Sequence, residues 1–228
     1  VVRFGFCFGK RAYVRSAWNL LALTIVCVSF LVLAADAWAG APARPASRRT
    51  TPVSLKAPVE IQVTGVTSRR ISSKIVIQNN MDAVWKTLTD YDNLSTHVPN
   101  LIKSYRVPQK DGKSIRGFQE GAQNGVGCDF SASLLMDMKE VRRDALRRPL
   151  PQPYLSFTCV ESFFFQVFSG EWRLVDADAG DGGNPATELR YCVDITPKGL
   201  VPAAAIEFQV KQEVPSNLLG LKRACEMS

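Results

Sequence analysis

The stretch CDFSASLLMDM, residues 128–138, carries the clearest pattern in this chain and decides which kind of fold to expect. Apolar side chains occupy every second position from 128 to 138, and polar side chains fill four of the five positions between them, with Leu135 as the exception. A period of two residues is that of a β-strand with one dry and one wet face. Such strands are typical of antiparallel sheets.

The same alternation predicts more strands on both sides of this stretch. It is clear at 71–77, 155–159, 168–174 and 189–195, and weaker at 101–107 and 113–120. Two segments between the strands favour loops, because glycine, proline and polar residues gather there: a Pro/Arg-rich one at 142–153 and a Gly-rich one at 178–185.

Helices are predicted between the first two strands. Asn80 can cap a first helix, in which apolar residues recur at helical spacing: Met81, Val84, Leu88 and Tyr91. Asp90 marks the end of that helix. Asp92 is predicted to cap a second, shorter helix that ends near Pro99, because the residue before a proline disfavours the α conformation.

A longer helix is predicted after Pro202. Its apolar stripe follows helical spacing: Ile206, Val210, Val214, Leu218 and Leu221. Pro215 lies inside the pattern and removes one backbone hydrogen bond, so we expect it to kink or split the helix.

This order of elements predicts an α+β fold in which a curved antiparallel sheet covers its dry face with one long C-terminal helix. A sheet curled around a single helix often leaves an internal cavity, although a filled core is the simpler interpretation for any one residue. The predicted lining consists of apolar and aromatic side chains: Trp85, Phe130, Leu134, Met136, Phe157, Trp172, Tyr191, Ile206, Val210, Val214 and Leu218. No metal ligand is predicted among them.

The net charge of +7 belongs to the N-terminal quarter of the chain. Residues 1–39 contain four basic residues and Asp36, and residues 40–59 contain four basic residues and no acid. These two segments account for the whole excess, so residues 60–228 carry no net charge. A nucleic-acid-binding face needs a concentrated positive field, and we therefore expect no nucleic-acid partner.

The N-terminal segments are typical of a targeting address. Residues 18–35 form an uncharged apolar run that ends before Ala37-Trp38-Ala39, a pattern of signal peptides. We predict a signal peptide or signal anchor over 1–39, a disordered basic linker of transit-peptide composition over 40–59, and the folded domain over 60–228. Such a bipartite presequence resembles those of plastids surrounded by extra membranes. The alternatives are a secreted and a membrane-anchored protein.

The inventory of reactive side chains argues against catalysis. His97 is the single histidine, and the six cysteines form no CxxC pair, which excludes an ordinary Cys/His zinc cluster. Phosphate-binding glycine loops and metal-spaced carboxylates are not found either. We therefore predict no enzyme activity and no cofactor other than a bound lipid.

Five short motifs resemble a known family. They are SRRIS at 68–72, VWKTLTDYDNL at 84–94, VPNL at 98–101, FSGEW at 168–172 and VPSNL at 214–218. Together they resemble the coenzyme Q-binding START-like domains of the polyketide cyclase/dehydrase and lipid transport (SRPBCC, Bet v 1-like) superfamily, and most closely its plastid-type members. The resemblance covers about residues 66 to 226. His97 departs from it, because relatives tend to carry an apolar or aromatic residue there.

The resemblance implies a helix-grip fold, with two short helices after the first strand, and a cavity for a prenylquinone or another lipid. The expected function is non-catalytic binding, chaperoning or transfer of that ligand. Candidates for contacting its polar head are Tyr105, Gln119, Ser133 and Tyr191. The aromatic run at 163–165 breaks the alternation, so we expect at least one exposed ring there and transient contact with a membrane. The alternatives are a cyclase or dehydratase of the same superfamily and a ribosome- or protein-binding module.

Overall fold

A computed structural model describes residues 57–110, 114–125, 128–177, 183–199 and 203–227, without the side chains of 122–125, 128–131 and 203–205. The predicted leader at 1–39 and the linker up to residue 56 lie outside the described residues. Ala57 is buried and Val59 begins the first strand, so the described fold starts slightly before residue 60.

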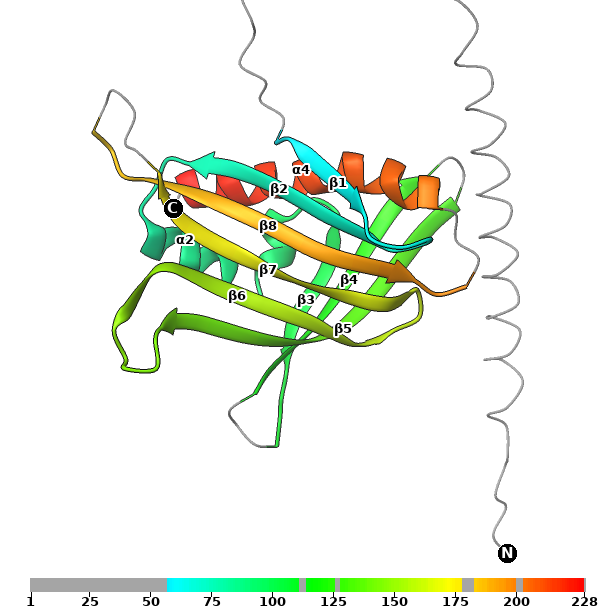
Figure 1. The fold of residues 1–228 in the computed structure, drawn as a ribbon, viewed down its shortest axis with the longest axis horizontal. Coiled ribbons are helices and arrows are strands. Elements are labelled where there is room, and N and C mark those ends of the chain that lie inside the picture. Colours follow the sequence, from blue (N-terminus) through cyan, green and yellow to red (C-terminus); the bar gives the residue numbers. More distant parts are fainter. Residues whose placement is uncertain (1–56, 111–113, 126–127, 178–182, 200–202, 228) are drawn as a thin grey trace, which may run out of the picture. The chain divides into compact units, whose positions relative to one another are not determined.

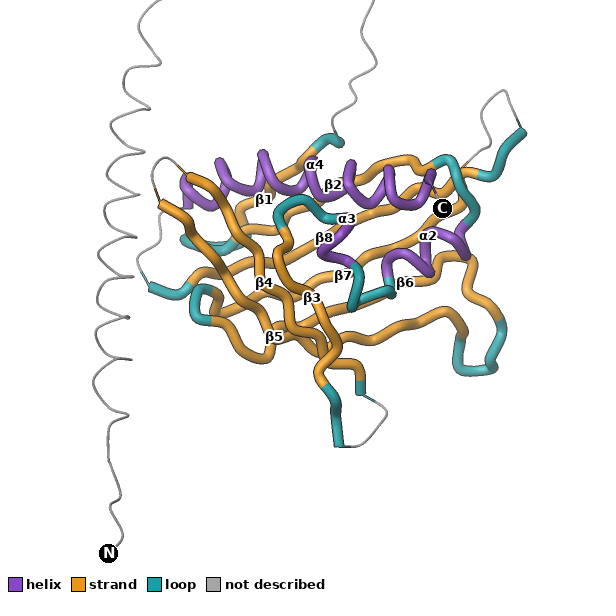
Figure 2. The backbone as a smooth tube through the Cα atoms, turned by 180° about the vertical axis from the view of Figure 1, so that it is seen from behind, coloured by secondary structure: helices purple, strands orange, loops and turns teal. Residues whose placement is uncertain are grey.

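Over the described residues, eight antiparallel strands form one curved open sheet, and three helices accompany it (Figures 1 and 2). Along the sheet the order is β1-β2-β8-β7-β6-β5-β4-β3. The strands are β1 (Val59–Val63), β2 (Arg69–Ile77), β3 (Leu101–Val107), β4 (Ile115–Gly125), β5 (Cys128–Arg143), β6 (Pro149–Ser162), β7 (Phe165–Ala177) and β8 (Ala186–Pro197). The helices are α2 (Met81–Leu88), α3 (Leu94–His97) and α4 (Ala203–Met227). The predicted α+β class with a terminal helix against a curved antiparallel sheet is confirmed.

Strand β1 is an addition to the predicted order. Its five residues pair with β2, Ile61 opposite Ile71, and extend the sheet at that edge. The strand is short and only Val59, Ile61 and Val63 alternate, which gives too weak a signal against the linker before it.

The loop predicted at 142–153 is wrong in extent. Strand β5 continues to Arg143 and β6 already begins at Pro149, which lies opposite Arg143. The Asp144 carboxylate accepts the backbone N–H groups of Leu146 and Arg148, both at 2.8 Å, and closes a short turn. The prolines are tolerated in β6 because it pairs with β7 over Tyr154–Thr158, beyond the proline-rich part.

The helix predictions are confirmed at one cap and wrong at another. The Asn80 side chain accepts the backbone N–H of Ala83 at 2.8 Å and caps α2, which ends at Leu88, two residues before Asp90. Helix α3 instead starts after Asn93, and the Asp92 carboxylate accepts the backbone N–H of Arg106 on β3 at 2.8 Å. Asp92 therefore ties the helical segment to the sheet.

Helix α4 passes through Pro215 as one element of 25 residues, so the predicted split does not occur. A proline costs the helix a hydrogen bond, but Pro215 is buried, and packing along the helix offsets that cost. The helix lies along β2 and β1 and contacts α2 and α3 (Figure 2).

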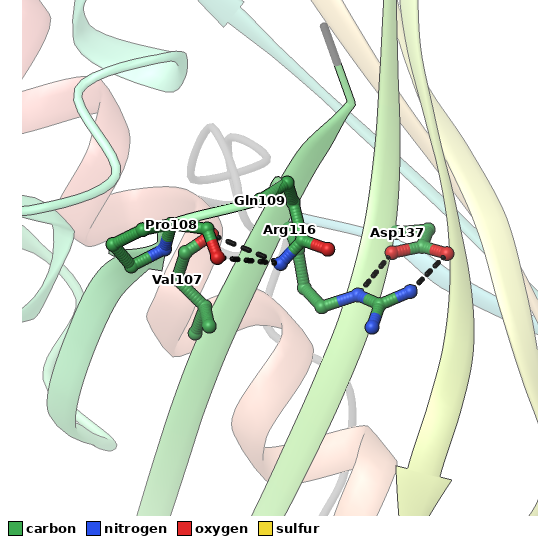
Figure 3. Close-up of polar contacts among 5 residues, drawn as sticks. All are labelled: Val107, Pro108, Gln109, Arg116 and Asp137. Carbon is green, nitrogen blue, oxygen red and sulfur yellow. Dashed lines mark hydrogen bonds and ion pairs between the residues drawn. The ribbon is translucent and has the colours of Figure 1, made fainter. Parts of the chain in front are cut away.

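An ion pair on the outer face helps to set the register of β4 against β5 (Figure 3). Arg116 of β4 donates two hydrogen bonds to Asp137 of β5, at 2.6 and 2.8 Å, and the two residues are direct cross-strand partners. Where β3 ends, the Gln109 side chain donates to the carbonyl groups of Val107 and Pro108 at 3.1 and 3.2 Å. A one-residue slip would separate the Arg116–Asp137 pair and turn each strand's apolar residues outward.

Candidate ligand site on the inner face of the sheet

The inner face of the sheet follows directly from the strand register. In β2, β8 and β7 the cross-strand partners Ile71, Val193 and Gly170 point to one side, as do Ile75, Leu189 and Leu174 in the same strands. Helices α2 and α4 cover this side, which contains the main apolar cluster.

One end of the inner face is tightly filled, and we call it the packed end. It lies under α2 and the C-terminal half of α4, where the Asn79 side chain donates to the Cys225 carbonyl at 2.6 Å. Its core residues are at most 1% exposed: Ile77, Val84, Leu174, Leu189, Leu218 and Cys225. Such a region is a solid core.

The other end is only half covered, and we call it the open end. It lies under the N-terminal half of α4, and its inward apolar side chains remain partly accessible: Leu134, Phe165, Phe168, Trp172, Tyr191, Ile206 and Val214. Accessible apolar surface that faces a protein's own helix is costly in water and favours an apolar ligand.

Aromatic rings form a continuous row through the open end. The ring centroids of Trp172 and Tyr191 are 4.4 Å apart, those of Tyr191 and Phe157 6.2 Å, and those of Phe157 and Phe168 5.7 Å. Phe165 continues the row 5.3 Å from Phe168. The row offers flat, polarisable surface at spacings typical of aromatic pairs.

Gly170 makes room for this row. A Cβ at this position would overlap the backbone carbonyl of Cys192 and lie 2.8 Å from the Phe157 ring. The glycine of the FSGEW motif is therefore required for packing, because only a residue without a side chain lets Phe157 reach across β7.

The hairpin between β6 and β7 stands beside the open end. The Ser162 hydroxyl accepts the backbone N–H groups of Phe164 and Phe165, at 3.2 and 3.3 Å, and the Lys198 ammonium donates to the Ser162 carbonyl at 2.8 Å. Phe163 at the tip is 55% exposed, which confirms the expectation of an exposed ring in this run.

A polar group faces the open end from α4. The Glu213 carboxylate accepts a hydrogen bond of 2.7 Å from the Gln209 side chain. Burial raises the Glu213 pKa to about 7, because the charged form loses hydration there. Burial raises the Tyr191 pKa as well, and the negative charge of Glu213 raises it further, so Glu213 lies within electrostatic reach of the Tyr191 hydroxyl.

Comparison with protein families now identifies the fold. The sequence model of the family described as polyketide cyclase / dehydrase and lipid transport matches residues 77–222. This chain belongs to that family. The resemblance proposed from the sequence is confirmed at this level, while its coenzyme Q-binding and plastid-type parts remain predictions. A search of curated proteins finds no significant match.

Solved structures of this cyclase and lipid transport fold agree with the assignment. A STAR-related lipid transfer protein from Xanthomonas axonopodis superposes with a TM-score of 0.58 at 13% identity, covering 77% of this chain and 96% of that one. A START superfamily protein from Mycobacterium smegmatis gives 0.55 at 11%, covering 69% and 97%. The Zhui aromatase/cyclase from a Streptomyces species gives 0.52 at 18%, covering 70% and 94%. These likenesses confirm the START-like, helix-grip fold.

Within this family fold, the predicted lining residues divide into partly accessible and buried members. Leu134, Trp172, Tyr191, Ile206 and Val214 are at the open end and partly accessible. The other described members are buried in the same cluster: Trp85, Met136, Phe157, Val210 and Leu218. The Phe130 side chain lies outside the description.

Trp85 is a predicted lining residue that lies in the packed end. Its side chain is 5% exposed, and the Arg142 guanidinium lies over its ring, 5.3 Å from the centroid. Arg142 also forms an ion pair with Asp82 on α2. These contacts fix Trp85 between α2 and β5, which makes it a reference tryptophan for experiments at the open end.

The predicted head-group residues separate by face. Gln119 and Tyr191 lie on the inner face, with Gln119 opposite the buried Ser104 of β3. Tyr105 and Ser133 are on the outer face, so their assignment is wrong: Tyr105 is 45% exposed and stacks on Phe118, and Ser133 is exposed opposite Glu120. The backbone alternation of β3 and β5 sets these orientations.

Three inward polar residues are missing from the predicted lining. Gln209 and Glu213 follow the helical spacing of the apolar stripe on α4, because each lies three residues after a member of it, Ile206 and Val210. That spacing was the signal that could have found them. Ser104 is a third: its hydroxyl is the one buried side-chain polar atom without a hydrogen-bond partner in the described part of the chain.

Metal and acid–base groupings are sparse. Over the described residues, no set of three His, Cys, Asp or Glu side chains is placed to hold a metal ion. His97 ends α3, and its Nδ1 is 3.3 Å from the Thr96 hydroxyl. No helix in the described part of the chain combines the length and hydrophobicity that a membrane span requires.

A hollow of about 330 Å³ on the outer face is a poor place for a lipid. Its rim is charged, and most of the charges are paired: Lys74 and Arg190 with Glu188 at 3.3 and 2.6 Å, and Arg173 with Glu171 at 2.9 Å. An apolar ligand there would have to displace water from these ions without replacing their hydration.

Proposed function

We propose that this protein binds an apolar lipid at the open end and carries it without chemical change. The observation that supports this proposal is the row of partly accessible aromatic and aliphatic side chains on the inner face, from Phe165 to Trp172 and Ile206. Each buried CH₂ group of a lipid tail contributes about 0.8 kcal/mol relative to water. The lipid transfer protein of similar fold is consistent with such a role.

We further propose a prenylquinone as the preferred ligand. A quinone ring is flat and suits the paired rings of Trp172 and Tyr191, whose centroids are 4.4 Å apart. An isoprenoid tail would extend along the partly accessible Phe168 and Phe165. If the address in residues 1–59 directs the protein to a plastid, plastoquinone-like molecules are the expected cargo.

The test uses quenching of tryptophan fluorescence in the full chain. A quinone next to an indole ring quenches its emission, so added decyl-plastoquinone should quench in a saturable way. Trp172→Phe should lose most of this quenching. Trp85→Phe, the matched change at the packed end, should keep it. Equal quenching in both variants, or none that saturates, contradicts the proposal.

A second candidate function is a cyclase or dehydratase reaction, and Glu213 is the observation that favours it. A carboxyl group with a pKa of about 7 is suited to move protons near neutral pH. A solved structure of similar fold is an aromatase/cyclase. Incubation of the full chain with its co-purified lipids, followed by chromatography and mass spectrometry, separates the two. A carrier returns its ligand unchanged, while an enzyme releases either an isomer with a different retention time or a product lighter by one water molecule.

The proposed destination has its own test. Residues 1–59 fused to a fluorescent protein should bring it into the plastid of an alga whose plastid is surrounded by extra membranes. Secretion of the fusion, or retention in the endoplasmic reticulum, contradicts the plastid address and favours the alternatives.

A further inference from the structure

Glu213 interrupts the apolar inner surface of α4. It lies three residues after Val210, which is 8% exposed, and four residues before Asn217, whose side chain accepts a hydrogen bond from Asn100 of the segment between α3 and β3. Spacings of three and four residues place all three side chains on one helix face. A carboxyl group on a buried face costs stability unless its oxygens are hydrogen-bonded or paired.

The bonding of Glu213 is incomplete. Gln209 donates one hydrogen bond to Oε1, at 2.7 Å, and within the described chain no protein group bonds Oε2. Tyr191 of β8 lies within electrostatic reach of Glu213, because the charge of Glu213 raises the Tyr191 pKa. One carboxyl oxygen is therefore available to a ligand at the open end.

Other charged groups around α4 are engaged elsewhere. Arg69 of β2 forms an ion pair of 2.7 Å with Glu207, nearly two turns before Glu213. His97 of α3 lies beside Gly220, about two turns after it. The inward residues of β1 are the apolar Val59 and Ile61, and the charged residues of α2 are exposed.

Burial is accordingly the cause of the raised Glu213 pKa, which is about 7. Around neutral pH the group changes from a carboxylic acid, which can donate a hydrogen bond, to a carboxylate, which can only accept. The two forms suit different ligand heads: a carbonyl oxygen needs a donor, and a hydroxyl group needs an acceptor.

We propose that Glu213 binds the polar head of the lipid, donating to a carbonyl head when it is protonated and accepting from a hydroxyl head when it is ionised. For a prenylquinone, these heads are the quinone and the reduced quinol. The open end therefore prefers the quinone in acidic medium and the quinol in alkaline medium. This inference rests on the proposed lipid-binding function.

The test compares decylubiquinone with decylubiquinol, kept reduced under nitrogen, by calorimetric titration of the full chain at pH 6 and pH 8. The two probes share one tail, so the ratio of their dissociation constants isolates the head. Each hydrogen bond gained or lost changes affinity about fivefold. The quinone-to-quinol ratio of dissociation constants should therefore rise at least about fivefold from pH 6 to pH 8.

Glu213→Gln is the informative variant, because an amide both donates and accepts at every pH. For this variant, the quinone-to-quinol ratio of dissociation constants should be independent of pH. Glu226→Gln, the same change at the exposed C-terminal end of α4, should behave as the unmodified chain. A ratio that does not change with pH in the unmodified chain, or changes equally in Glu213→Gln, overturns the head-group assignment alone. Absence of saturable binding of both probes overturns the proposed function with it.

Discussion

The two ends of the inner face share one sheet and one helix but differ in what fills them. At the packed end, Leu174 and Leu189 are enclosed by α2 and the C-terminal half of α4. At the open end, the same strands present Trp172 and Tyr191, which stay partly accessible under the N-terminal half of α4. We infer that the packed end supplies stability and that the open end is left for a ligand.

A matched pair of leucine truncations gives the largest contrast. Leu174→Ala at the packed end should lower the free energy of unfolding by about 3 to 4 kcal/mol, because it leaves a cavity among fully enclosed neighbours. Leu134→Ala at the open end should cost about 1 kcal/mol, because its side chain is already partly in contact with water. Urea denaturation of the full chain and both variants measures the difference. Equal losses would show that the open end is part of the solid core.

Gly220→Ala tests how closely α4 approaches the rest of the packed end. In an ordinary helix this change stabilises by about 1 kcal/mol. Here the added Cβ would overlap the His97 carbonyl and lie 2.8 Å from Cδ of Pro99. We expect a net loss of about 2 kcal/mol, since α4 must move away from α3.

Thermal denaturation measures this change, with Ala203→Gly at the start of α4 as a propensity control. That control should cost no more than about 1 kcal/mol. A Gly220→Ala variant more stable than the unmodified chain would show that the approach is looser than the structure has it.

The open end should make stability depend on pH through Glu213. Its pKa is raised from 4.5 to about 7 in the folded chain, so the folded state holds a proton that the unfolded state has released. The group's favourable contribution is complete below about pH 4.5 and is lost as pH rises through 7. The expected loss is on the order of 2 kcal/mol.

Urea midpoints at pH 5 and pH 8 measure that loss. Glu213→Gln should remove most of the difference and should be the more stable chain at pH 8. Glu226→Gln, exposed at the other end of the helix, should keep it. The same fall in Glu213→Gln would assign the pH dependence to other groups.

Some of these features could be predicted from the sequence and others could not. The difference is whether the physical cause is local or involves segments far apart in the chain. Alternation is local, so it predicts which side of β5 faces inward, and even the Leu135 exception has a local meaning: it lies opposite Phe118 on the outer face. Capping by Asn80 is local as well. Asp92 is different, because its partner is the backbone of Arg106 on another strand.

The division into a packed and an open end could not be predicted from local pattern. Leu174 and Trp172 alternate identically in β7, and only the positions of α2 and α4 over the sheet give one a full set of neighbours and the other an accessible face. The same holds for Pro215, whose burial in the middle of α4 lets the helix continue through a residue that usually ends it.

The smallest effect on stability is expected for a substitution at the tip of the β6–β7 hairpin. This substitution can separate stability from lipid transfer. Phe163 is 55% exposed, and its ring packs edge-on against that of Phe164, with the ring centroids 4.9 Å apart. Phe163→Ser should change the free energy of unfolding by less than about 0.5 kcal/mol. If the hairpin touches the bilayer during loading, the variant should take up quinone from vesicles several-fold more slowly while its equilibrium affinity stays the same.

Val66→Ser serves as the matched control, because Val66 is a second exposed apolar residue, 96% exposed, and lies far from the hairpin in sequence. Equal slowing in both variants would indicate a general loss of surface hydrophobicity, whereas slowing in Phe163→Ser alone assigns entry to the open end.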